Sequence, residues 1–157
     1  LKWLGGKMVS VGEDVSIRRM NADDAEAVCD IYGKITKELV ESDFKRLLEE
    51  HTEKEGPAIC FVAEWDGKIV GFMITYILPF GFGIERSSAW IATMGVHPKY
   101  MGQGIGGKMA REILGYYKDR GISVIHTSVR WDSTDVLSFF KSLGFDRSEL
   151  INLSKPL

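Results

Sequence analysis

The chain has 157 residues, a length that predicts one domain with a full hydrophobic core and leaves too little for two. Its 45% hydrophobic and 27% charged residues are average for a globular protein, which excludes a disordered or fibrous chain. The net charge of −2 gives no electrostatic attraction for nucleic acid or an anionic membrane, so we expect neither as a partner.

The two cysteines, Cys29 and Cys60, lie far apart in apolar surroundings and form no Cys/His cluster. We therefore expect no metal site and no disulfide framework, and a reducing cytoplasm fits this usage. No apolar run approaches the ~20 residues that cross a bilayer. Residues 1–12 have no signal-peptide core, so we interpret them as a leader or cloning remnant and residues 13–157 as the single domain.

The first predicted elements are a strand over 15–20 and two helices. Asn21, followed by two aspartates, favours a helix start, because its side chain accepts from first-turn amides and acidic residues suit the positive helix end. Apolar residues at helical spacing carry this helix through Tyr32. A second helix is predicted around residues 44–48.

A β-hairpin follows, with strands over 58–64 and 68–78 and a turn at Asp66-Gly67. Residues 80–87 form a glycine-rich aromatic loop, and residues 88–96 are a further strand. The aromatic residues of the loop, together with Trp90 and Trp131, are candidates for lining an acceptor pocket, with ordinary packing as the alternative.

An amphipathic helix is predicted over 104–119, then a strand over 122–130 and a helix over 133–143 with Gly144 as its C-cap. A last strand is predicted over 145–153. After the first strand and two helices, the order is βββαβαβ. This order predicts a mixed α+β fold (an α/β sandwich) in which helices cover both faces of one central sheet.

The loop before the amphipathic helix contains four glycines among residues 102–107. Missing side chains let a ligand approach the backbone, and the unpaired amides of the first helical turn point outward with the positive end of the helix dipole behind them. The segment therefore predicts a phosphate or pyrophosphate site. The alternative is a glycine-rich turn without a ligand.

Two nucleotide-binding patterns match this loop literally. Gly102, Gly104 and Gly107 satisfy G-x-G-x-x-G, but a dinucleotide-binding fold needs these glycines directly after a strand, and here residues 97–101 intervene. The spacing from Gly102 to Lys108 resembles a P-loop, but Met109 stands where a hydroxyl holds Mg²⁺. Both patterns are weaker than the one that also explains the flanking residues.

Met94-Gly95-Val96 at a strand end, then His97-Pro98, a tyrosine and G-x-G-I-G, resembles the acetyl-CoA motif of the GNAT family of N-acetyltransferases. V-R-W-D-S at 129–133 and F-F-K-S-L-G-F at 139–145 are similar to the ending of that family. I-R-R at 17–19 and A-E-W-D-G-K-I-V-G at 63–71 are similar to its opening strand and its hairpin. The resemblance covers about residues 15–150 in the family's order and implies the GNAT acyl-CoA N-acyltransferase fold.

The resemblance implies acetyl-CoA as co-substrate. Backbone amides of the glycine loop would hold the pyrophosphate, and the end of the preceding strand would pair with the pantetheine arm. An amine would attack the thioester directly, and the amide of Gly95 or Val96 would stabilise the oxyanion. The implied acetyl-CoA-binding residues are Met94, Gly95, Val96, Met101, Gly102, Gln103, Gly104, Ile105, Gly106, Gly107, Ser133 and Phe140.

Three positions depart from the family pattern. Phe140 replaces the tyrosine that commonly serves as the acid, Ser133 replaces an asparagine, and Met101 replaces an arginine or glutamine. Two functions therefore stay open: an N-acetyltransferase acting on a primary amine, either a small molecule or a peptide N-terminus, and a non-catalytic acyl-CoA-binding or regulatory module. The oligomeric state is open too, with a homodimer among the alternatives.

The attacking amine must be neutral, so the reaction benefits from a base. Glu85, in the loop before the strand at 88–96, and His97, which directly follows that strand, are the candidates. A solvated loop charge is the alternative for Glu85, and a non-catalytic residue is the alternative for His97. We interpret His126 as a packed or edge histidine of its strand.

Overall fold

The computed structural model describes residues 2–4, 7–9, 14–37, 44–46, 48–49, 58–78 and 87–157. These form two compact units, Leu1–Thr127, which contains the main sheet, and Ser128–Leu157, which contains a helix. The single domain expected over 13–157 stays a prediction.

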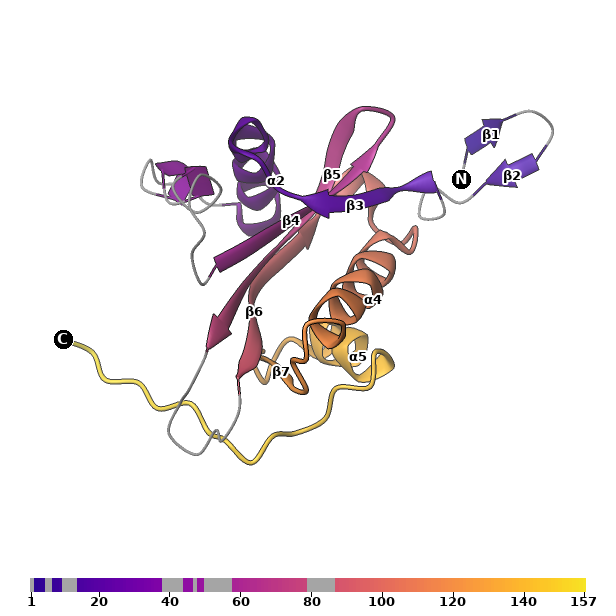
Figure 1. Cartoon of the computed structure of the whole chain (residues 1–157). Helices are drawn as coiled ribbons and strands as arrows, with labels where there is room; N and C mark the ends of the chain where they lie inside the picture. Colours follow the sequence, from indigo (N-terminus) through magenta and orange to yellow (C-terminus); the bar gives the residue numbers. More distant parts are fainter. Residues whose placement is uncertain are drawn as a thin grey trace. The chain divides into compact units, whose positions relative to one another are not determined.

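The described strands of the first unit build a five-stranded sheet in the order β3-β4-β5-β6-β7 (Figure 1). The strands are β3 (Ser16–Arg19), β4 (Ala58–Trp65), β5 (Lys68–Leu78), β6 (Ser88–Val96) and β7 (Ile125–Thr127). Neighbours from β3 to β6 are antiparallel, whereas β7 runs parallel to β6. The predicted hairpin is confirmed: Asp66 and Gly67 both have positive φ, which suits the tight turn between β4 and β5.

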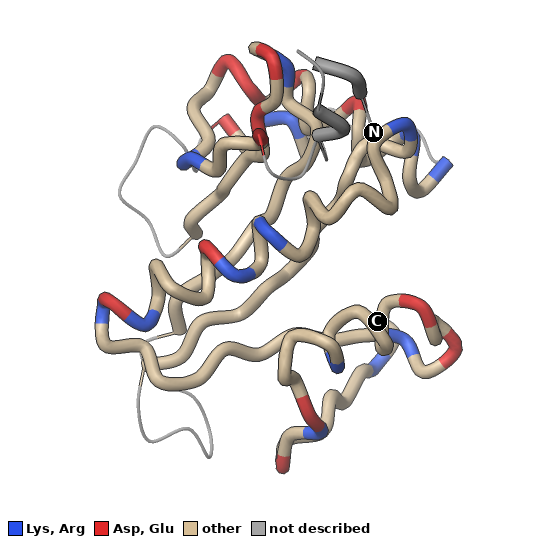
Figure 2. The backbone as a smooth tube through the Cα atoms, turned by 90° about the vertical axis from the view of Figure 1, so that its right-hand side faces the viewer, with Lys and Arg blue, Asp and Glu red and all other residues tan. Residues whose placement is uncertain are grey.

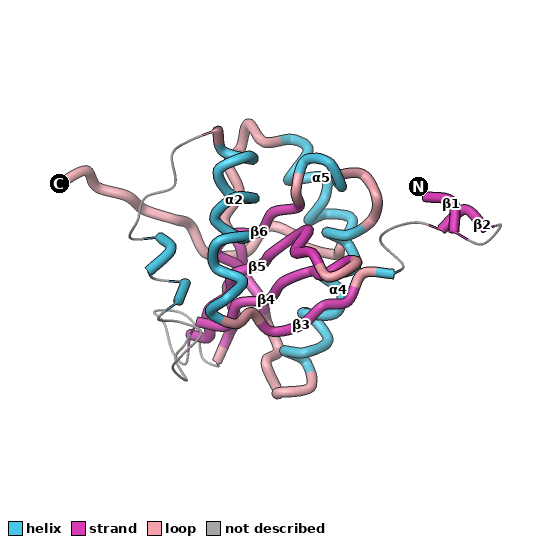
Figure 3. Tube along the Cα trace, turned by 90° about the horizontal axis from the view of Figure 1, so that it is seen from above, coloured by secondary structure: helices cyan, strands magenta, loops and turns pink. Residues whose placement is uncertain are grey.

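The helices are η1 (Ala22–Asp24), α2 (Ala25–Thr36), η2 (Pro98–Tyr100), α4 (Ile105–Lys118) and α5 (Thr134–Ser142). Residues 44–46 and 48–49 are also helical, as predicted. In the first unit α2 and α4 lie on opposite sides of the sheet (Figures 1 and 3).

Alternation along β5 explains how both faces of the sheet are filled. Phe72 and Ile74 point toward α2 and share a buried cluster with its Val28. Thr75 points the other way, where its hydroxyl is hydrogen-bonded to Tyr117 of α4. Both faces are therefore covered by a helix, as the predicted α+β fold requires.

An ion-pair network joins β3, β4 and the end of η1. The Arg18 guanidinium donates to both oxygens of Asp24, at 2.7 and 2.8 Å, and to Glu64 at 2.8 Å. Burial alone would raise the pKa of the Asp24 carboxyl, but hydrogen bonds from Arg18 and from the Asn21 amide outweigh it and hold that pKa below its usual value. The network fixes the position at which the chain leaves β3 and enters α2.

β1 (Lys2–Leu4) and β2 (Lys7–Val9) pair antiparallel in a separate two-stranded sheet. The interpretation of residues 1–12 as a leader stays a prediction. Among the helices that the structure describes, none combines the length and apolar character needed to span a membrane. Figure 2 shows Lys and Arg interspersed with Asp and Glu along the chain instead of gathered in long runs of one sign.

The predicted strand over 122–130 is much shorter in the structure, because β7 contains only Ile125–Thr127. Before β7, the Ile122 amide donates to the Tyr117 carbonyl and so belongs to the end of α4. After it, Ser133 donates to the Arg130 carbonyl in a turn. The outer ends of the predicted strand are thus used by other local structure, whereas the Val124 carbonyl, just before β7, still accepts from the Ala89 amide of β6.

The last predicted strand, over 145–153, is wrong: within the described stretch 87–157 these residues pair with no strand. Local side chains occupy the backbone groups that a strand would use. Asp146 accepts from the amide of Arg147, and the Ser148 hydroxyl accepts from the amide of Leu150. Such contacts compete with a strand ladder, so the polar run keeps this segment irregular.

In the second unit, α5 ends at Gly144, whose φ of +87° is the left-handed conformation expected after a helix C-cap. The Phe145 amide donates back to the Phe140 carbonyl, which completes this ending. The ring of Phe140 is buried, with its centroid 5.3 Å from that of Phe139 and 5.0 Å from that of Phe145. Phe140 therefore anchors the small aromatic core of this unit.

Candidate functional site

The glycine loop leaves η2 and enters α4 through two left-handed residues. Gly102 has a φ of +73° and Gly104 a φ of +80°, a conformation that a residue with a Cβ adopts only at an energetic cost. A Cβ built on either glycine would meet no atom of the described residues within 4 Å. The backbone geometry therefore requires glycine here, and the space above the loop is open.

The first turn of α4 presents unpaired amides. The Lys108 amide makes the first bond of the helix, to the Gly104 carbonyl at 3.0 Å, so the amides of residues 105–107 have no intrahelical acceptor. Gly104 has no side chain with which to cap them, and no acidic residue lies in this turn. A dianionic phosphate fits such a helix end.

Two basic residues near this turn behave differently. The Lys108 ammonium donates to the Val15 carbonyl at 2.6 Å, so it points to the start of β3 instead of to the loop. The Arg111 guanidinium folds back along the helix and would lie 3.2 Å from a Cβ on Gly107. The missing side chain of Gly107 thus makes room for a cation beside the first turn.

The edge of β6 is open next to the loop. β7 pairs with β6 only from Ala89 to Ile91, so from Ala92 to Val96 no described strand of the first unit pairs with β6 on that side. On the other side Thr93 to Val96 stay paired with β5, and the register skips Ala92 at an irregularity. An open strand edge is able to pair with an extended ligand that carries amides.

The register decides which groups face the open edge. The amide of His97 donates to the Val70 carbonyl of β5 at 2.9 Å. Because an antiparallel strand alternates the direction of its backbone groups, Gly95 also faces β5, whereas Met94 and Val96 direct their amides and carbonyls to the open edge. Of the two amides predicted to stabilise an oxyanion, the Val96 amide faces this edge and the Gly95 amide does not.

Gly95 is explained by packing. A Cβ at this position would lie 2.5 Å from Cδ1 of Ile35 and 2.8 Å from Cε1 of Phe72. Such distances are far inside van der Waals contact. The glycine therefore allows α2 to lie close against β6.

Both ring nitrogens of His97 contact donors of the protein itself. Nδ1 accepts from the Lys99 amide at 3.1 Å, and Nε2 lies 3.2 Å from the Lys34 ammonium, which also binds Asp30 at 2.5 Å. His97 thus joins the loop at η2 to α2. Its predicted role as a base stays a prediction, and in this arrangement neither ring nitrogen is without a protein contact.

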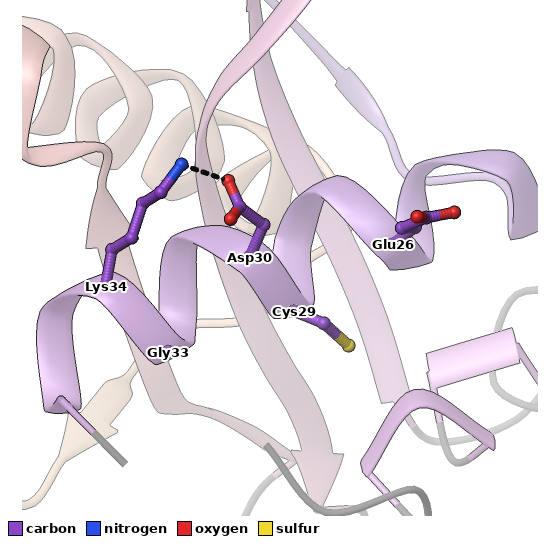
Figure 4. Close-up of a pocket in the computed structure, with 5 residues that line it drawn as sticks. All are labelled: Glu26, Cys29, Asp30, Gly33 and Lys34. Carbon is purple, nitrogen blue, oxygen red and sulfur yellow. Dashed lines mark hydrogen bonds and ion pairs between the residues drawn. The ribbon is translucent and has the colours of Figure 1, made fainter. Parts of the chain in front are cut away.

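A hollow of about 420 Å³ lies along α2, and Figure 4 shows the residues that line it. They are Glu26, Cys29, Asp30, Gly33 and Lys34. Burial raises the pKa of the Cys29 thiol, and it raises that of Cys60 to about 11, so neither thiol ionises readily near neutral pH. In the part of the chain that the structure describes, no three His, Cys, Asp or Glu residues gather as a metal site.

The remaining predicted residues lie elsewhere. Glu85 lies outside the described residues. Ser133 and Phe140 belong to the second unit, where Ser133 directly precedes α5 and Phe140 is buried. Sequence reasoning gave His126 no chemical role, yet the structure places it beside Trp90 where β6 and β7 begin to separate. No sequence signal marks this position, because it depends on the register of two strands.

The sequence model of the acetyltransferase (GNAT) family matches residues 25–145. An acetyltransferase of Pectobacterium atrosepticum is 29% identical over 143 residues, which are 91% of this chain and 96% of that protein.

Similar solved structures include an aminoglycoside N-acetyltransferase in complex with CoA, with a TM-score of 0.79 and 16% identity over 90% of this chain and 94% of that one. A ribosomal-protein-alanine N-acetyltransferase from Brucella melitensis biovar Abortus has a TM-score of 0.74 and 17% identity over 91% of this chain and 99% of that one. At these identities the structural likeness concerns the fold alone, and it agrees with the predicted fold.

Proposed function

The chain belongs to the acetyltransferase (GNAT) family, and we propose that it is an acetyl-CoA-dependent N-acetyltransferase whose acceptor is a primary amine. The observation that carries the proposal is the junction of two features. A helix start with unpaired amides, at residues 102–107, comes after a strand whose edge is open from Ala92 to Val96, with five residues between them. A ligand in which a pyrophosphate is joined to an arm that carries amides would bind the helix start through its phosphates and the strand edge through its amides.

The residues at this junction fit acetyl-CoA as a co-substrate. The pyrophosphate would accept hydrogen bonds from the amides of residues 105–107, and the open space above Gly102 and Gly104 would admit it. The pantetheine amides would pair with Met94 and Val96 along the open edge. Met101 and Gln103 complete the loop, and contributions of Ser133 and Phe140 to acetyl-CoA binding are part of the same proposal.

The chemistry proposed here is direct transfer. A neutral amine attacks the thioester carbonyl, the C–N bond forms, and the developing oxyanion is stabilised by a backbone amide of the open edge, near the point where β6 and β7 separate. The C–S bond then breaks and CoA leaves as a thiolate. Phe140 has no proton to donate, so the thiolate takes a proton released by the reacting nitrogen or by water.

The phenylalanine at 140 favours a second candidate function, a non-catalytic acyl-CoA-binding or regulatory module. This alternative predicts the same ligand without turnover. The similar structures include enzymes named for an aminoglycoside and for a ribosomal-protein alanine. We therefore keep both a small-molecule amine and a peptide N-terminus as proposed acceptors.

The test is thiol release from acetyl-CoA against a panel of alkylamines, arylamines, aminoglycosides and peptides. Release with any of these amines supports the enzyme, whereas acetyl-CoA binding without release supports the binding module. Failure of the chain to bind any CoA species would contradict both.

A matched pair of variants shows whether the loop is responsible. Gly104→Asp and Gly104→Asn have nearly the same shape and both tolerate a left-handed backbone, so they differ mainly in charge. The Asp variant should bind acetyl-CoA about tenfold or more weakly than the Asn variant, because its carboxylate would face the pyrophosphate. Equal affinities would place the pyrophosphate elsewhere.

A further inference from the structure

The inference concerns the point at which β6 and β7 separate. Trp90 is paired with His126 and Ile91 with Thr127, which is the last pair before the edge of β6 opens. The Thr127 hydroxyl donates to the Ile91 carbonyl at 3.1 Å and closes this last pair. His126 therefore lies within one residue of the open edge.

Among the described residues of the first unit, α4 covers one face of the sheet at this level, and the opposite face carries half-buried side chains. Ile91 pairs with Thr75, so both side chains point to the face that α4 covers, and Ile91 is buried. Trp90 and His126 point to the opposite face, where both are half-buried. An acceptor that approaches a thioester at this point of the sheet would meet His126 and Trp90.

The His126 ring has an aromatic neighbour but no hydrogen-bond partner among the described residues. It stacks on Trp90 with ring centroids 5.0 Å apart and planes 29° apart. Among the described residues His126 makes no hydrogen bond, in contrast to His97, whose two ring nitrogens both contact donors. On the same face, the Trp90 indole nitrogen and the hydroxyl of fully buried Ser88 likewise lack a hydrogen-bond partner among the described residues.

We propose that His126 is the proton acceptor for the amine and that Trp90 forms the wall against which the acceptor lies. This inference rests on the proposed acetyl transfer. Neutral His126 takes one proton from the alkylammonium, and the resulting amine attacks the thioester carbonyl. The C–N bond forms, the C–S bond breaks, and the second proton of the nitrogen goes to the departing thiolate. His126 then releases its proton to water.

Among the described residues, the titratable groups next to Trp90 on β5 and β4 add no charge to this face. Tyr76 of β5 pairs with Trp90, and Cys60 of β4 pairs with Ile74, two residues before Tyr76 on the same face. Burial raises the pKa of both groups, so both stay neutral through the range in which histidine titrates. Lys34 lies at the far end of β6, beside His97.

The test compares His126→Gln with wild type on two acceptors. An alkylamine is protonated at neutral pH and needs a base, whereas an arylamine is already neutral. For the alkylamine kcat/KM should fall about a hundredfold or more, the range of general-base catalysis, and for the arylamine it should fall less than about threefold. His97→Gln is the matched comparison, and its ratio of alkylamine to arylamine rates should equal that of wild type.

Control measurements separate the possible failures. Acetyl-CoA affinity and the unfolding transition show that His126→Gln is folded and binds its co-substrate. Equal loss on both amines, or no loss on either, would overturn the role of His126 and leave acetyl transfer standing. No thiol release by the wild-type chain with any amine would overturn the proposed enzyme and this inference together.

A second measurement needs no substitution at 126. In wild-type chain labelled with carbon-13 histidine, addition of alkylamine to the CoA complex should shift the His126 ring signal, with the three histidine signals assigned through His51→Gln and His97→Gln. An unchanged His126 signal would contradict the proposal.

Discussion

The two ends of α4 look alike in sequence and differ in chemistry. Gly104 precedes the helix and Gly121 follows it, and both have positive φ with open space where a Cβ would lie. At the C-terminal end the carbonyls of residues 115–118 all accept hydrogen bonds, from residues 119–122. At the N-terminal end the amides of residues 105–107 have no intrahelical acceptor.

The comparison teaches that a glycine in a left-handed conformation does not itself mark a site. Gly121 ends a helix whose backbone groups are satisfied by the chain that follows. Gly104 precedes a helix whose first amides have no intrahelical acceptor and are able to bind a ligand, at the end where the helix dipole favours an anion. The unpaired amides therefore distinguish the candidate site.

Replacing the glycine at each end of α4 with valine should give the largest difference between an effect on acetyl-CoA binding and an effect on stability. Gly104→Val and Gly121→Val both force a β-branched residue into a left-handed backbone, which destabilises by about 1–3 kcal/mol in each case. Only Gly104→Val should weaken acetyl-CoA binding, by about ten- to a hundredfold, the worth of one hydrogen bond to a charged group. Urea denaturation and calorimetry measure the two effects. Similar affinity losses at both ends would break the comparison.

A glycine outside α4 should behave as a packing residue. Gly95→Ala places a methyl group against Ile35 and Phe72, so we expect a loss of about 1–3 kcal/mol in the free energy of unfolding. The shortened variant Ile35→Val, which lacks Cδ1, should restore part of the loss in the double mutant. Full stability of Gly95→Ala would show that α2 does not lie so close to β6.

Removing the Lys108 ammonium should change stability more than binding. Since this group donates to the Val15 carbonyl, Lys108→Met should destabilise by about 1 kcal/mol and alter acetyl-CoA affinity less than about threefold. A P-loop lysine would instead be essential for its ligand. A large loss of affinity in Lys108→Met at unchanged stability would mean that the side chain turns toward the ligand.

The smallest effect is expected in the middle of α4. Gly115 lies within the helix, and a Cβ there would meet no described atom within 4 Å. Gly115→Ala should therefore stabilise the chain by about 0.5–1 kcal/mol without changing acetyl-CoA affinity. Thermal unfolding measures the gain, and a destabilised variant would reveal a neighbour at this position.

Local sequence signals were sufficient for much of the fold. The strands over 68–78 and 88–96 were predicted with their observed bounds, because a two-residue turn precedes the first and continuous apolar residues fill both. The strand prediction over 145–153 was wrong, because it gave the apolar residues of this segment more weight than the polar run at 146–149. Whether such a segment pairs depends on a neighbouring strand, which local sequence does not report.

The candidate site likewise has one part that local sequence predicts and another part that depends on contacts between distant residues. The glycine loop was predictable because its conformation is local to residues 102–107. The direction of the Val96 amide, the contact between Gly95 and Ile35, and the stacking of His126 on Trp90 depend on register and on helix placement. These contacts join residues far apart in the chain, so spacing along the sequence did not predict them.

The most direct measurement is isothermal titration of the chain with acetyl-CoA, CoA, ATP and NAD. The account predicts binding of acetyl-CoA and CoA at one site per chain, binding weakened by about ten- to a hundredfold in Gly104→Val, and unchanged binding in Gly121→Val. Binding of ATP or NAD in place of CoA, or acetyl-CoA binding that is unchanged in both variants, would contradict the central claim that the amides at the start of α4 hold the pyrophosphate of acetyl-CoA.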